Sequence, residues 1–70
     1  MTEQMASDIN SLMLDVSARL DVSLRNMMDA GAPEFEQYRE SVGKLLEIML
    51  FEVMNPIYKE YPQLKPHQLR

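Results

Sequence analysis

One histidine and a scattered set of hydroxyls are the side chains best suited to nucleophilic or acid–base chemistry. His67 is the only histidine, and it lies in a tail beside Pro66. Nucleophilic catalysis needs a base held near the nucleophile by a third group, and no serine has such a base within a plausible rigid framework. The sequence therefore predicts no catalytic residue.

Three acidic side chains, Glu36, Glu40 and Glu47, are candidates for a di-metal carboxylate site of the kind that helical bundles hold. Di-metal sites in helical bundles use a glutamate followed three residues later by a histidine, and this chain lacks that spacing. Glu36 and Glu40 instead have Arg39 and Lys44 at helical spacing, which indicates ion pairs on a solvated face. We expect no metal and no cofactor.

Glu47 and Glu52 stand apart because they interrupt the most apolar stretch of the chain, 45–54. They either form a narrow solvent edge or are partly buried at an interface, where each would need a cationic, tyrosine or backbone partner. The first interpretation is favoured. The second keeps open a small-ligand carrier or enzyme whose pocket forms between two chains, with these acids, Tyr58 or Tyr61 as its polar groups.

The first half of the chain has the spacing of one long amphipathic helix. No glycine or proline occurs from Thr2 to Asp29, and Thr2 or Ser7 supplies a capping oxygen. We predict a helix over about 5–29. Apolar residues recur at steps of three and four: Met5, Ile9, Leu12, Met13, Val16, Leu20, Leu24, Met27 and Met28. The opposite face carries two acid–base pairs, Asp15 with Arg19 and Asp21 with Arg25.

A short turn follows at 30–33, because Gly31 suits the position after a helix end and Pro33 suits the start of the next helix. A second helix is predicted over 34–54. Short connections make neighbouring helices antiparallel, so the two form a hairpin. Gly43, inside the second helix, marks either a close approach of two helix backbones or a tolerated surface glycine.

Asn55 and Pro56 are typical of a helix break, with Asn55 as a cap. A short third helix is predicted over 56–61, and a kinked continuation of the second helix is the alternative. The tail 62–70 contains Pro62 and Pro66 and is expected to be extended against the bundle through Leu64, or frayed.

Size and composition indicate how such a chain is stabilised. A 70-residue chain with 46% apolar residues has the balance of one folded domain, 1–70, yet it has no cysteine, so oligomerisation or very good helix packing must reinforce its small core. The net charge of −4 argues against nucleic acid and anionic membranes as partners. No signal peptide or membrane span is visible, and a cytoplasmic setting is the default expectation.

We therefore predict an all-α protein, an antiparallel two-helix hairpin with a short third helix that dimerises into a four-helix bundle. The expected function is that of a non-catalytic interaction or regulatory protein that binds itself and, as a second partner, another protein. A nucleic-acid-associated protein is a further alternative. The stretch after Lys44 is apolar on most sides, and the predicted interface comes from it and the next turn: Leu46, Leu50, Phe51, Val53, Met54, Ile57 and Tyr58.

Overall fold

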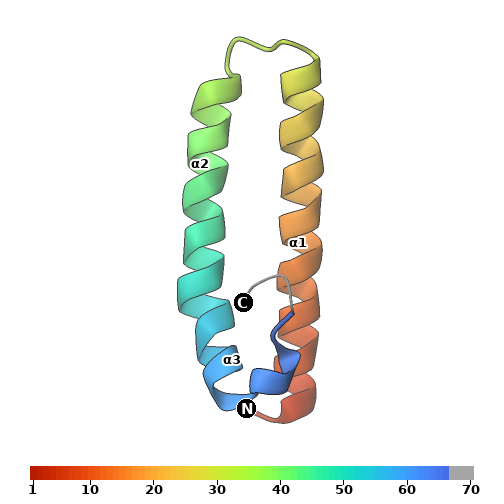
Figure 1. Ribbon diagram of the computed structural model, residues 1–70, viewed down its shortest axis with the longest axis vertical. Coiled ribbons are helices and arrows are strands. Elements are labelled where there is room, and N and C mark those ends of the chain that lie inside the picture. Colours follow the sequence, from red (N-terminus) through yellow and green to blue (C-terminus); the bar gives the residue numbers. More distant parts are fainter. Residues whose placement is uncertain (67–70) are drawn as a thin grey trace.

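The computed structural model describes residues 1–66 and is helical throughout its regular segments. Two long helices run antiparallel, and the chain then turns back across the open end of the hairpin (Figure 1). The molecule measures 43 × 20 × 16 Å. The predicted all-α helical hairpin is confirmed. Within the described residues, no helix is at once long and apolar enough to span a membrane.

Helix α1 spans Glu3–Asp29. Of the two capping candidates, Thr2 is the one used, since its Oγ1 accepts a hydrogen bond of 3.1 Å from the Met5 N–H. Glu3 adds a carboxylate to the first turn, where the helix dipole favours negative charge. The helix thus begins two residues earlier than predicted, and Ser7 lies inside it.

Gly31 ends α1 in a left-handed conformation with φ of 67°. The Gly31 N–H donates to the Met28 carbonyl and the Ala32 N–H to the Met27 carbonyl, which is the Schellman arrangement that closes a helix end. Pro33 then lies in a second turn, closed by the Phe35 N–H and the Ala32 carbonyl at 3.1 Å. Proline suits the second position of such a turn, and α2 therefore begins after it.

Helix α2 spans Phe35–Ile48 and continues without a break into a π-helical turn, η1, at Met49–Met54. Asn55 has helical angles of −60° and −44°, and its N–H donates to the Leu50 carbonyl, five residues earlier. Asn55 is therefore not a helix cap, and that expectation was wrong. Proline has no N–H and its ring crowds the carbonyl four residues before it, so the wider π turn makes room for Pro56.

Helix α3 spans Asn55–Glu60 and is followed by a 3₁₀ turn, η2, at Pro62–Leu64. Figure 1 shows α3 bending toward the first turns of α1, with the following segment against that helix. The main core lies at this end of the hairpin, and its buried members are Ala6, Met54, Ile57 and Tyr58. The rest of the predicted tail, 67–70 with His67, lies outside the described residues.

Val42 is the buried anchor of the long part of the hairpin, with 1% of its surface exposed. Gly43 beside it is exposed, and a Cβ built there would meet nothing within 4 Å. Within this chain, the interpretation of Gly43 as a close approach of two helix backbones is therefore wrong. It is a surface glycine.

Candidate functional site

The seven residues predicted to form an interface fall into two groups. Three are buried inside the single chain, each with 7% or less of its surface exposed: Met54, Ile57 and Tyr58. The other four keep some exposed surface. Leu46, Leu50 and Val53 are partly buried, and Phe51 exposes 62% of its surface. The interface itself stays a prediction. Among these seven residues, the accessible apolar surface lies chiefly at Phe51.

A buried polar pair joins the third helix to the first. Asn10 exposes 7% of its surface, and its Oδ1 accepts a hydrogen bond of 2.5 Å from the Tyr58 hydroxyl. The Asn10 Nδ2 donates to the Leu64 carbonyl at 3.2 Å. Burial raises the pKa of Tyr58, because the apolar surroundings disfavour the phenolate. One amide thus ties α3 and η2 to α1.

The position of Asn10 in the sequence contains a signal for this pair, although Asn10 is not in the predicted apolar stripe. Asn10 lies four residues after Ala6 and three before Met13, so it shares a helix face with the residues that meet the core. Met5 and Leu12, which the predicted stripe included, are each 56% exposed. The true inward face of α1 is therefore turned from the predicted stripe toward Ala6 and Asn10.

The start of the chain and the segment after α3 are held together by two polar contacts. The Tyr61 hydroxyl donates to the Met1 carbonyl at 2.7 Å, and the Gln63 amide donates to the Glu3 carboxylate. The pKa of Tyr61 is raised by desolvation and by the nearby charges of Glu60 and Glu3. These contacts fix the segment against α1 and leave its polar groups engaged in structure.

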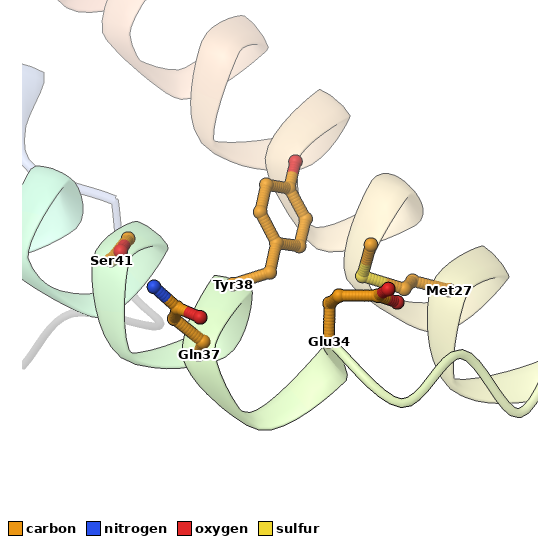
Figure 2. Close-up of a pocket in the computed structure, with 5 residues that line it drawn as sticks. All are labelled: Met27, Glu34, Gln37, Tyr38 and Ser41. Carbon is orange, nitrogen blue, oxygen red and sulfur yellow. The ribbon is translucent and has the colours of Figure 1, made fainter.

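A shallow notch opens between α1 and α2 near the turn (Figure 2). The Tyr38 ring crosses between the helices, and its hydroxyl shares a hydrogen bond of 2.8 Å with Ser23. The remaining lining side chains are Met27, Glu34, Gln37 and Ser41. Glu34 is the only ionisable acid among them and is exposed, so the notch presents a polar rim and no base paired with a nucleophile.

The same side of the hairpin continues as an apolar surface. On α1, a stripe of residues at steps of three or four runs from the open end to the notch: Ile9, Leu12, Val16, Leu20, Ser23 and Met27. On α2 and η1 the matching stripe is Ser41, Leu45, Ile48 and Glu52. Met27 and Ser41 both line the notch, and Ile9 and Glu52 both line a depression at the other end. The two stripes therefore border one face.

We name the centre of this side the mid-hairpin face and define it as Leu12, Val16, Leu45 and Ile48. Leu12, Leu45 and Ile48 expose 56%, 50% and 52% of their surfaces, and Val16 is half-buried. The opposite side has its own apolar depression, but Leu14 there is only 37% exposed and Leu46 and Leu50 are partly buried. The mid-hairpin face therefore offers more apolar surface to a partner.

The acidic side chains lie on solvated surfaces. Glu47 and Glu52 are exposed, as the favoured interpretation of the apolar stretch expected. Ion pairs of 3.3 Å join Asp15 to Arg19 and Asp21 to Arg25, and one of 2.8 Å joins Glu36 to Arg39. This contact raises the pKa of Arg39. Among residues 1–66, no three acids, histidines or cysteines gather where a metal ion would bind.

Comparison with known proteins gives no relative for this arrangement. No protein-family model matches the chain, and no curated protein or solved structure is significantly similar to it. Inferences about function therefore rest on the chain's own surface and contacts.

Proposed function

We propose that this chain is a non-catalytic interaction protein that acts as a homodimer of helical hairpins, a four-helix bundle, in the cytoplasm. A bound protein of another kind is its regulatory target. The observation that supports this proposal most directly is the solvent-accessible surface area of the chain. A compact protein of 8.2 kDa is expected to expose about 4500 Å². This chain exposes 5329 Å².

The excess of about 800 Å² equals what each partner buries in a stable protein–protein interface of standard size. Its physical origin is the two-helix architecture, because two helices side by side cover each other on one face only. Apolar residues make up 46% of the chain, yet only five apolar residues of the described part are buried. A second hairpin is the simplest cover for the rest.

The hydrogen bonds of the polar side chains support a structural role for these groups and not a catalytic one. Asn10 and Tyr58 bond to one another, Ser23 bonds to Tyr38, and Tyr61 bonds to the Met1 carbonyl. Every buried side-chain nitrogen and oxygen of residues 1–66 has a hydrogen-bond partner. The first two contacts hold one helix to another, and the third holds the segment after α3 to the start of the chain.

Sedimentation equilibrium tests the proposal directly. At low micromolar concentration the chain should sediment with twice its 8.2 kDa mass, and its melting temperature should rise with protein concentration because dimerisation is linked to folding. A folded species that stays monomeric over the micromolar range, with a melting temperature independent of concentration, would exclude the homodimer.

A further inference from the structure

We propose that the mid-hairpin face is the surface on which a second copy of this chain packs, related to the first by a two-fold axis through that face. The inference rests on the proposed self-association and specifies where it occurs. It places the contact away from Phe51, on the side of the hairpin that carries Leu12, Val16, Leu45 and Ile48.

The composition of the face is that of an interface centre. Between its two ends the stripes as defined carry apolar residues and serine, and they are bordered by Arg19, three residues after Val16, and by Glu52 at the rim. Cores of protein interfaces are depleted in charged residues and bordered by polar ones. Three of the four residues of the face expose about half of their surface, so a partner has side chains to bury.

The position of the face along the molecule favours a second copy over an unlike partner. Val16 is the central residue of α1, which spans Glu3–Asp29, and Leu45 and Ile48 lie opposite the middle of that helix. A two-fold axis through this point lays one 43 Å hairpin along the whole length of the other. A two-fold interface joins one patch to the same patch on the other copy. When that patch lies at mid-length, each hairpin covers the other from end to end.

The exposed area of the whole chain is sufficient for such a dimer. Antiparallel hairpins stacked along their full length form a four-helix bundle, and each copy then covers one long side of the other. The surplus of about 800 Å² per chain is the amount that a standard dimer buries on each partner. A short peptide bound at Leu45 would leave most of that surplus exposed.

Two matched substitutions test the position of the interface. Ile48→Glu places a charge on the mid-hairpin face, and Phe51→Glu places the same charge three residues later, outside it. Their side chains are 52% and 62% exposed, so neither change introduces a charge into the core. In sedimentation equilibrium, Ile48→Glu should raise the dimer Kd by about 100-fold or more, as expected at an interface centre, and Phe51→Glu by less than about 3-fold.

The outcomes separate the inference from the proposed function. If the unmodified chain is monomeric, self-association fails, and the interface fails with it. If the unmodified chain dimerises and Phe51→Glu dissociates it while Ile48→Glu does not, the proposed function stands and the mid-hairpin face is wrong. Circular dichroism of each variant shows whether it is folded.

Cysteine cross-linking gives a second readout that does not depend on a disruptive charge. The chain has no cysteine, so Val16→Cys, Leu45→Cys and Phe51→Cys each introduce a single thiol. A disulfide needs Cα atoms within about 7 Å, which only positions near the two-fold axis meet. Under mild oxidation, Val16→Cys or Leu45→Cys should give covalent dimers and Phe51→Cys should not. The reverse pattern would overturn the inference.

Discussion

The Tyr58 hydroxyl donates a hydrogen bond of 2.5 Å to Oδ1 of Asn10, 48 positions earlier in the chain. Both residues are buried, each with 7% of its surface exposed. The bond therefore connects α1 to α3 inside the main core, at the open end of the hairpin. Because a buried polar group without a partner is unfavourable, each residue depends on the other.

Tyr58→Phe should destabilise the protein by about 1 to 3 kcal/mol, because it leaves the Asn10 carbonyl oxygen buried with no donor. The free energy of unfolding in urea measures this change. The variants are compared at one protein concentration, since association contributes concentration-dependent stability. Tyr61→Phe is the matched control, because the Tyr61 hydroxyl bonds a backbone carbonyl at an exposed position.

A double-mutant cycle isolates the pair itself. In a chain that already carries Asn10→Ala, Tyr58→Phe should cost less than in the natural sequence, with a coupling of about 0.5 kcal/mol or more. Strictly additive effects would show that the hydroxyl and the amide do not stabilise each other.

Alkaline pH should destabilise the protein through Tyr58. Burial raises the pKa of this side chain in the folded state above its ordinary value of about 10. The folded state therefore keeps a proton that the unfolded state loses. The stability that Tyr58 contributes is fully present below pH 10 and is lost as the pH rises through the folded-state pKa.

Urea unfolding at a series of pH values from neutral to strongly alkaline measures this effect. The free energy of unfolding should fall less steeply with pH in Tyr58→Phe than in the natural sequence. Tyr61→Phe should retain the part of this alkaline fall in the free energy of unfolding that comes from Tyr58. Equal alkaline slopes in Tyr58→Phe and the natural sequence would contradict a buried, neutral phenol.

The hairpin was predictable because its signals are local. Steps of three and four define α1, and Gly31 and Pro33 place the turn, although Pro33 lies within the turn and not at the start of α2. Asn10 and η1 were not predicted, for a different reason. Burial of Asn10 depends on Tyr58 and Leu64 arriving from the far end of the chain, and the π turn is a response of a packed helix to Pro56. Neither appears in the periodicity of one segment.

Gly31→Ala should destabilise the protein by about 1 to 2 kcal/mol, because a residue with a Cβ resists the left-handed conformation. Gly31 has φ of 67° and closes α1 through the Schellman hydrogen bonds of its own N–H and that of Ala32. Nothing lies within 4 Å of a Cβ at this position, so the strain is in the backbone. Gly31→Asn is the informative control, because asparagine tolerates this conformation better and should recover part of the loss in thermal unfolding.

Gly43→Ala should have the opposite effect and stabilise the protein by about 0.5 to 1 kcal/mol. Gly43 lies inside α2 and is exposed, and alanine reduces the conformational freedom of the unfolded chain without meeting any atom within 4 Å. Gly43 is two positions from both Ser41 and Leu45, which puts it on the other side of α2 from the mid-hairpin face. The dimer Kd should therefore stay unchanged while the melting temperature rises. A weakened dimer in Gly43→Ala would instead place this glycine where the backbones of two copies meet.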